Sequence, residues 1–184
     1  MFKKNIMKKT HTKFKGLILI KGKTHYDRRG FFRELIHQNL IPGKIVFTVI
    51  SKSKKNILRG LHFQEKKAQG KFLSVLKGRI FDVGVDLRKN SKTYLKYFSC
   101  ELSEKNNVSI YLPPGFAHGF YTFEKENIIL YGCTNYRDKN SEKGIMWNDK
   151  DLKIKWPCTK PVLSKKDKLN KSLREYLNFK NGKF

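Results

Sequence analysis

The stretch that decides the fold is Lys71–Arg88, which reads KFLSVLKGRIFDVGVDLR. In its second half, apolar residues alternate with polar or small ones, and the apolar positions are Phe81, Val83, Val85 and Leu87. This period of two predicts a half-buried β-strand. Lys77 and Gly78 supply a tight turn after the preceding apolar run, so the two runs are predicted to pair as a hairpin.

On either side of this stretch, short runs of strand-forming residues follow one another, separated by turn residues. They are GLILIKG, FFRELIH, KIVFTVIS, NILRGLHF, YLKYFSCEL, SIYLP, GFYTFE and NIILYGCTNY. Many short strands of this kind predict an all-β sandwich or barrel. Helical spacing is confined to SKKDKLNKSLREYLNF near the C-terminus, with Leu169, Leu173 and Leu177 on one face and a Ser/Asp-type start.

A single domain is expected, because the chain has 184 residues and no Gly/Ser-rich or Pro-rich linker. Its uncharged apolar runs fall far short of the roughly 20 residues of a membrane helix, and the N-terminal MFKKNIMKKTHTKFK lacks a signal-peptide core. We therefore expect a cytoplasmic protein without a membrane partner. Cys100, Cys133 and Cys158 are widely separated, which predicts neither a disulfide framework nor a zinc site.

The formal net charge of +26, from 41 Lys+Arg against 15 Asp+Glu, suggests a nucleic-acid or anionic-membrane partner. However, the lysines outnumber the arginines, are spread through loops and both termini, and accompany no helix-turn-helix, zinc-finger or RNA-binding signature. We expect no nucleic-acid partner and keep a basic nucleic-acid-binding protein as the alternative of another class. An anionic small-molecule substrate is favoured, because several basic residues lie inside the apolar strand patterns.

Two histidines lie within these patterns. In ILRGLHFQ, Leu61 and Phe63 share one parity and His62 falls on the other, so His62 is predicted to face the opposite side of its strand. In LPPGFAHGF, the Pro-x-Gly-x-x-His spacing that ends at His118 resembles the second motif of the cupin superfamily, whose histidine commonly binds a metal. The first cupin motif needs another histidine where Gln64 stands. Because this ligand set is incomplete, we expect no metal, and a metal-dependent cupin is the alternative.

Several further motifs, in order and nearly full length, resemble the dTDP-4-dehydrorhamnose 3,5-epimerase family. They are DRRGFFRE, RGLHFQ, QGKFLSVLKGRIFDVGVDLR, LSEKNN, LPPGFAHGF, WNDKDLKIKWP and LSKKD. The resemblance implies one cupin-like epimerase domain over residues 1–184, with its core at about 16–167 and peripheral termini. It also implies a metal-free, all-β jelly-roll barrel with a short C-terminal helical segment, usually a homodimer with exchanged strands.

The implied reaction inverts carbon 3, carbon 5 or both in a nucleotide-linked 4-keto-6-deoxy sugar, without a cofactor, in surface-polysaccharide (lipopolysaccharide) or deoxysugar biosynthesis. The C4 ketone acidifies the protons on both carbons, so the reaction needs a base, an enolate stabiliser and an acid. A dTDP-linked sugar is favoured and a GDP-linked one is the alternative. A carbon-3-only epimerase or a keto-isomerase on the same fold is the alternative reaction.

Four residues are expected to be catalytic, and the resemblance assigns three of them. His62 matches the base, for which an ordinary imidazole pKa of about 6.5 is suited, and Asp167 matches its dyad partner. For Asp167 the alternative is a charge at a helix N-terminus. Tyr131 matches the acid, with Tyr136 as its rival, because a phenol with a pKa near 10 stays protonated at rest. Lys71 is assigned from the chemistry and not from the resemblance: the enolate oxygen needs fixed positive charge, which Lys71 can supply, and the alternative is that Lys71 serves the pyrophosphate.

Six residues are expected to bind the substrate, and they are Arg29, Phe32, Glu34, Arg59, His118 and Tyr136. The first three match a family segment that reaches the nucleotide, often from the neighbouring subunit: Glu34 reads a base edge, Phe32 packs on it and Arg29 contacts phosphate. Without the resemblance, an exposed strand with this pattern would be interpreted as a dimer edge. The two interpretations are compatible. Arg59 serves the enolate or the pyrophosphate. His118 lines the sugar pocket opposite His62 or is a satisfied structural histidine, and Tyr136 is a core residue or a ring that stacks on the nucleotide.

The chain departs from the family at one place. A Gln-x-Asn pair that touches the substrate usually precedes the segment SKSKKNILRG, whereas this chain has Phe47, Thr48 and Val49 there. The catalytic set is kept, which favours retained epimerase chemistry. The loss of both amides suggests that the sugar, the nucleotide or the number of inverted carbons has changed.

Overall fold

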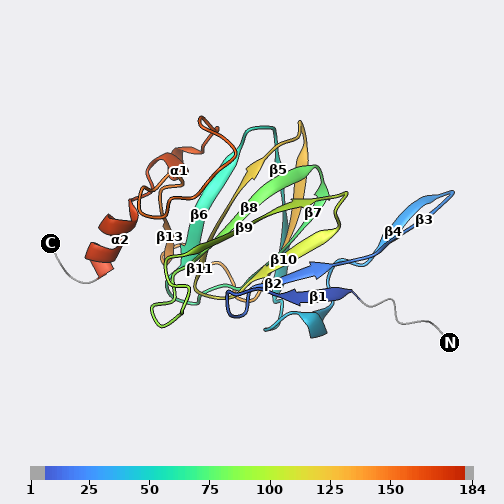
Figure 1. The fold of residues 1–184 in the computed structure, drawn as a ribbon, viewed down its shortest axis with the longest axis horizontal. Helices are drawn as coiled ribbons and strands as arrows, with labels where there is room; N and C mark the ends of the chain where they lie inside the picture. The colour runs from blue at the N-terminus through green and yellow to red at the C-terminus, as the bar shows by residue number, and fades with distance from the viewer. Residues whose placement is uncertain (1–6, 181–184) are drawn as a thin grey trace.

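The computed structural model describes residues 7–180, and Figure 1 shows two antiparallel sheets that face each other. The six-stranded sheet has the order β1 (Lys8–His11), β2 (Ile18–Lys21), β10 (Val108–Leu112), β7 (Lys71–Lys77), β12 (Asn127–Cys133) and β5 (Phe47–Ser53). The five-stranded sheet has the order β13 (Glu142–Gly144), β6 (Leu58–Gln64), β11 (Phe116–Thr122), β8 (Arg79–Asp86) and β9 (Tyr97–Ser103). The predicted all-β, cupin-type jelly roll is confirmed.

Apolar side chains from both sheets fill the space between them. The fully buried members include Leu73 on β7, Ile80 on β8, Ile110 on β10 and Ile129 on β12. A second cluster lies on the outer face of the five-stranded sheet, where residues 145–178, here called the C-terminal segment, cover it (Figure 1). Both faces of that sheet are therefore shielded from water around its central strands.

The predicted hairpin of β7 with β8 is wrong, because these strands belong to different sheets. β7 pairs with β10 and β12, whereas β8 pairs with β11 and β9. Gly78 carries the chain from one sheet to the other with a φ of 84°, and its carbonyl accepts a hydrogen bond from the Glu104 amide at 3.1 Å. A Cβ at Gly78 would lie 2.5 Å from the Glu126 carbonyl oxygen, so the corner requires glycine.

The expectation that β8 is half-buried is also wrong. Val83 and Val85 point outward but pack beneath the C-terminal segment. Asp82 and Asp86, on the opposite face, are as fully buried as the valines. The alternation is real, but the polar face of the strand looks into the barrel and not into solvent.

The C-terminal helical segment consists of two short helices. α1 (Lys165–Lys168) begins after Ser164, whose Oγ accepts a hydrogen bond from the Asp167 amide, as the Ser/Asp-type start predicts. The helix then ends, and four non-helical residues precede α2 (Leu173–Lys180). Leu173 is buried, but Leu169 is 83% exposed, so the predicted single leucine face is wrong at its first position.

A two-stranded arm, β3 (Thr24–Asp27) and β4 (Gly30–Arg33), projects away from the barrel (Figure 1). After it comes the 3-10 turn η1 (Gln38–Leu40), and Leu40 and Ile41 pack with Phe72 in a third apolar cluster. Residues 1–6 and 181–184, which belong to the predicted peripheral termini, lie outside the described residues. Within residues 7–180, no helix is long and apolar enough to cross a membrane.

Candidate active site

The predicted dyad forms in the structure. His62 on β6 faces away from Leu61 and Phe63, which pack outward in the cluster under the C-terminal segment. Its Nε2 lies 2.5 Å from Oδ1 of Asp167, a buried residue of α1. Because the carboxylate accepts the Nε2 proton, the neutral imidazole carries its lone pair on Nδ1. The sequence therefore brings together a histidine and a carboxylate that are 105 residues apart.

Asp167 is held in the ionised form. Burial would by itself raise the pKa of this carboxyl, but the hydrogen bond from His62 and the one from Ser164 outweigh it, and the pKa is lowered. The Ser164 hydroxyl donates to Oδ2 at 2.8 Å, so both carboxylate oxygens are occupied. Asp167 acts both as the predicted partner of His62 and as a residue in the first turn of α1.

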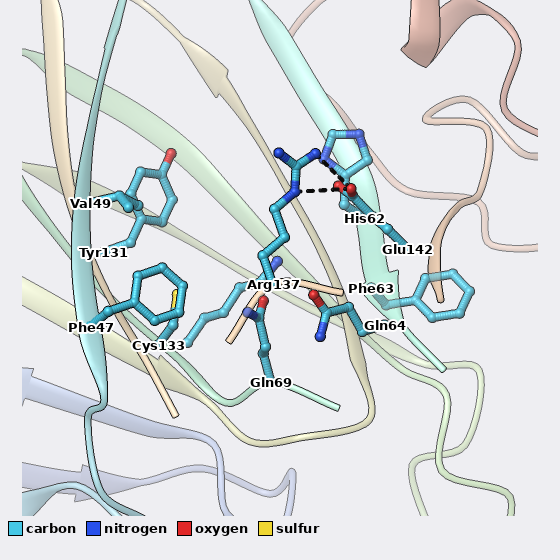
Figure 2. A pocket seen from close by; sticks show the side chains of 11 residues that line it. Phe47, Val49, His62, Phe63, Gln64, Gln69, Tyr131, Cys133, Arg137 and Glu142 are labelled. Carbon is cyan, nitrogen blue, oxygen red and sulfur yellow. Dashed lines mark hydrogen bonds and ion pairs between the residues drawn. The ribbon is translucent and has the colours of Figure 1, made fainter. Parts of the chain in front are cut away.

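A cavity of about 290 Å³ opens between the two sheets beside His62 (Figure 2). Its lining residues are Phe47, Val49, His62, Phe63, Gln64, Gln69, Lys71, Tyr131, Cys133, Arg137 and Glu142. Three of the four predicted catalytic residues, His62, Lys71 and Tyr131, line this one space. The fourth, Asp167, lines an adjoining hollow of about 400 Å³ that shares His62 with the cavity.

Tyr131 lies on β12, across the cavity from His62 (Figure 2). Burial raises the pKa of Tyr131 to about 12, so its phenol is protonated at neutral pH. Its hydroxyl lies 3.0 Å from Oγ of Ser51 on the neighbouring β5. A protonated phenol and an imidazole lone pair thus occupy opposite walls of one cavity.

Lys71 projects into the same cavity from β7, where its backbone is paired with that of Cys133. Burial lowers the pKa of the Lys71 ammonium, against smaller opposing effects of Cys133, Glu142 and Asp82. A desolvated cation interacts strongly with a nearby developing negative charge, because little water screens it.

His118 lies opposite His62 in the pairing of β11 with β6, but its ring is almost fully buried. Its Nε2 lies 2.7 Å from Oδ2 of Asp82, whose Oδ1 is buried without a hydrogen-bond partner among the described residues. His118 is not one of the side chains that line the cavity. The contact with Asp82 agrees with the alternative that His118 is a structural histidine with a satisfied partner. A role of His118 in binding substrate stays a prediction.

Arg59 lines the adjoining hollow together with His62 and Asp167. It is exposed, and its guanidinium donates to Oγ of Ser53 and to the Lys52 carbonyl oxygen at 3.1 and 3.3 Å. The structure thus places this predicted substrate-binding cation beside the dyad. Its position is compatible with a contact to phosphate outside the sugar cavity.

The departure at Phe47, Thr48 and Val49 lies in the cavity wall. Phe47 and Val49 both line the space, and Val49 is paired across the ladder with Tyr131. The Phe47 ring stacks on Tyr136 with centroids 5.7 Å apart and planes at 7°. Tyr136 is 67% exposed, so it is a surface aromatic and not a core residue. This wall is apolar where the family resemblance leads one to expect two amides.

The structure does not bring the remaining three predicted residues into the cavity of their own chain. Arg29, Phe32 and Glu34 belong to the projecting arm or follow it directly (Figure 1). Arg29 donates to both carboxylate oxygens of Asp27, and Glu34 lies 2.8 Å from Nε2 of His37. Phe32 is 66% exposed, which leaves its ring available for contacts outside this chain.

Sequence reasoning missed the polar residues Gln69, Arg137 and Glu142 in the cavity lining. Arg137 and Glu142 lie in a loop and on the short edge strand β13, in a stretch where no strand period was visible. Gln64 was noticed as the replacement of a cupin histidine. Its side-chain amide forms hydrogen bonds with the backbone of Lys67, Tyr136 and Asp138.

Among residues 7–180, no group of three or more His, Cys, Asp or Glu side chains is arranged to hold a metal ion.

Comparison with known proteins identifies the family. The family model described as dTDP-4-dehydrorhamnose 3,5-epimerase matches residues 11–175. The chain is 43% identical over 164 residues to the dTDP-4-dehydrorhamnose 3,5-epimerase of Salmonella typhimurium, covering 85% of this chain and 90% of that protein. It is 40% identical over 172 residues to the enzyme of that name from Methanothermobacter thermautotrophicus, covering 89% and 93%.

Solved structures agree. The dTDP-6-deoxy-D-glucose-3,5-epimerase of Legionella pneumophila, in complex with dTDP-4-keto-L-rhamnose, superimposes with a TM-score of 0.87 at 39% identity. That similarity covers 92% of this chain and 94% of the Legionella chain. Since the family model spans most of the sequence and the relatives are similar over most of their length, the chain belongs to the dTDP-4-dehydrorhamnose 3,5-epimerase family.

Proposed function

We propose that this chain is a cofactor-independent epimerase that inverts carbons 3 and 5 of a dTDP-linked 4-keto-6-deoxy sugar. The observation that carries the proposal is the cavity in which His62, paired with Asp167, faces the protonated phenol of Tyr131. The names of the relatives in the comparisons support the same reaction. They favour it over a carbon-3-only epimerase, a keto-isomerase or a nucleic-acid-binding protein.

The residues divide the chemistry between them. His62 removes the proton from carbon 3 or carbon 5, which the C4 ketone acidifies, and Asp167 stabilises the imidazolium that forms. Lys71 stabilises the enolate oxygen with its desolvated charge. Tyr131 then returns a proton from the opposite wall, which inverts the carbon. Each inversion leaves His62 protonated and Tyr131 ionised. His62 then releases its proton to water and Tyr131 takes one up, so the enzyme returns to its starting state and the net reaction consumes nothing.

The proposal has three finer parts: the nucleotide carried by the substrate, the oligomeric state and the pathway. The dTDP group is favoured over GDP because the Legionella relative binds a dTDP-linked sugar. We propose a homodimer in which the arm of one protomer delivers Arg29, Phe32 and Glu34 to the nucleotide in the other. Exposure of the Phe31 and Phe32 rings supports this assignment. We place the enzyme in cytoplasmic synthesis of deoxysugars for surface polysaccharide such as lipopolysaccharide.

Proton NMR in deuterium oxide with dTDP-4-keto-6-deoxyglucose tests the reaction. We expect deuterium to enter both carbon 3 and carbon 5, because one base in one cavity serves both positions after the ring reorients. Entry at carbon 3 alone would instead identify a mono-epimerase. If no deuterium enters either carbon, a different nucleotide or sugar becomes the next substrate to try, since the apolar wall at Phe47 and Val49 lies in the cavity.

Tyr131→Phe tests the acid. We expect product formation to fall by about 10²-fold while exchange of the substrate proton continues in part, because proton removal depends on His62 and reprotonation on the phenol. The measurement is the ratio of deuterium wash-in to epimerised product. Tyr121→Phe is a matched control, since the Tyr121 hydroxyl donates to Asn56 Oδ1 and does not line the cavity. An unchanged ratio in Tyr131→Phe would assign the acid to Tyr136 or to water.

A further inference from the structure

Arg137 lies where the catalytic cavity meets the adjoining hollow, since it lines both of them, as do His62 and Glu142. In Figure 2 its side chain extends across the cavity between Tyr131 and His62, and its guanidinium reaches Glu142. The bonds run from Nε and Nη2 to the same oxygen, Oε2, at 3.2 and 2.8 Å. No step of the proposed proton transfer uses this arginine.

The backbone that carries Arg137 is fixed on both sides. The Gln69 amide donates to the carbonyl oxygen of Asn135 at 2.7 Å, and Oε1 of Gln64 accepts from the amide of Asp138 at 2.9 Å. By contrast, the Arg137 side chain is 58% exposed. A fixed backbone with a solvated side chain allows the guanidinium to change partners while its point of attachment stays in place.

The ion pair with Glu142 can be given up without leaving that carboxylate alone. The second oxygen of Glu142, Oε1, lies 3.0 Å from Nζ of Lys166. Burial would raise the pKa of Glu142, but the bonds from Arg137 and Lys166 hold it below its ordinary value. If Arg137 moves, Lys166 still compensates the charge.

The nucleotide sugar supplies a stronger partner. The cavity of about 290 Å³ is at the lower end of the roughly 300–1,000 Å³ typical of ligand sites, so it suits the sugar better than the whole molecule. The side chains of Phe47 and Val49 carry no hydrogen-bond donor for a phosphate. The adjoining hollow adds the cations Arg59 and Lys166 to Arg137. Of its two carboxylates, Glu142 and Asp167, the second is already paired with His62.

We propose that Arg137 is a substrate-binding residue whose guanidinium leaves Glu142 and pairs with the diphosphate of the bound nucleotide sugar. A guanidinium matches phosphate oxygens in a two-point contact, which a carboxylate that shares its charge with Lys166 offers less well. Glu142 holds the arginine ready in the empty enzyme. This inference rests on the proposed function, because it takes the diphosphate of that substrate as the partner.

The test compares Arg137→Gln and Glu142→Gln in the full chain, by steady-state kinetics and by titration with dTDP and with inorganic pyrophosphate. We expect Arg137→Gln to raise KM and both dissociation constants by about tenfold, with kcat within about twofold, because one charged phosphate contact is lost from binding. Glu142→Gln should leave KM unchanged or lower it, since it frees the arginine. Arg174→Gln is the matched control, because Arg174 makes a comparable surface ion pair with Asp151 outside the cavity.

Unchanged dissociation constants in Arg137→Gln would overturn the inference, and so would equal losses in Arg137→Gln and Glu142→Gln, which would indicate a structural bridge. A wild-type chain that binds neither dTDP nor pyrophosphate would also overturn it. If the wild type binds dTDP but exchanges no substrate proton, the proposed reaction has failed, and the titrations still decide whether Arg137 contacts phosphate.

Discussion

His62→Ala is expected to lower the rate of exchange of the substrate protons by about 10³-fold, the middle of the range for a general base. The imidazole lines the cavity, and because a carboxylate holds its Nε2, the neutral ring keeps a lone pair on Nδ1 that can accept a proton. Exchange at carbons 3 and 5 should fall together, because one base serves both positions. The measurement is the initial rate of deuterium wash-in by NMR.

The fold should survive this change, because the His62 side chain is 26% exposed and its loss leaves the strand pairing of β6 intact. Far-UV circular dichroism of His62→Ala should therefore match the wild type. His11→Ala on β1 is a control, since His11 is exposed and does not line the cavity. Exchange that persists at a near-native rate in a folded His62→Ala variant would show that another group is the base.

Lys71→Met should lower kcat by about 10²- to 10³-fold, the loss typical when a preorganised charge is removed from a developing oxyanion. Methionine keeps the length and apolar stem of the side chain, so the change removes the charge with little change in packing. The substrate affinity should change less than kcat, because the enolate charge develops only during the reaction. Rapid-quench single-turnover measurements separate the two effects.

The pH profile tests the same role. Because burial lowers the pKa of Lys71 from the ordinary value of 10.5, wild-type activity should fall as pH rises through that lowered pKa. Tyr131, with a pKa of about 12, titrates later and does not produce this decline. Lys71→Met should lack the alkaline decline. Lys77→Met should keep it, because Lys77 lies on the same strand as Lys71 but is exposed and pairs with Glu126. A decline that is identical in Lys71→Met would assign it to another group.

Local sequence patterns predicted the strands but not their partners. The run before Gly78 and the run after it are both strands, as their composition indicates. Their pairing depends on β10, β12, β11 and β9, which come later in the chain and compete successfully for both edges. A tight turn between two strands predicts a hairpin only when the strands prefer each other to distant partners. No local signal at Lys77 and Gly78 carries that information.

Polarity misled the prediction in the same region. A half-buried strand places Asp82 on its solvent-facing side, whereas Asp82 is fully buried, which is rare for a charged residue without a partner. Its partner is His118, which lies 36 residues away on β11. Each residue was visible in the sequence, but their contact follows from the pairing of two strands. The buried pair could be inferred only after the register of β8 with β11 was known.

Within the site, the motif residues were the predictable part. The position of His62 on the face opposite Leu61 and Phe63 followed from parity alone. The contact of His62 with Asp167 followed from the family resemblance, since nothing in local spacing connects β6 with α1. Arg137 was missed because it lies in a loop, where neither periodicity nor a resemblance singles out one basic residue among the 41 lysines and arginines.

The contact of His62 with Asp167 also concerns the order in which the chain is made. Synthesis proceeds from the N-terminus, so β6 leaves the ribosome long before the segment that carries Asp167, 105 residues later. Leu173, close behind Asp167, packs with Val83 on the outer face of β8. The C-terminal segment therefore covers the barrel and gives His62 its carboxylate partner in one late event. A nascent chain that stops short of this segment has His62 but lacks its carboxylate partner. Under the proposed mechanism, such a chain gains activity only after Asp167 has been synthesised.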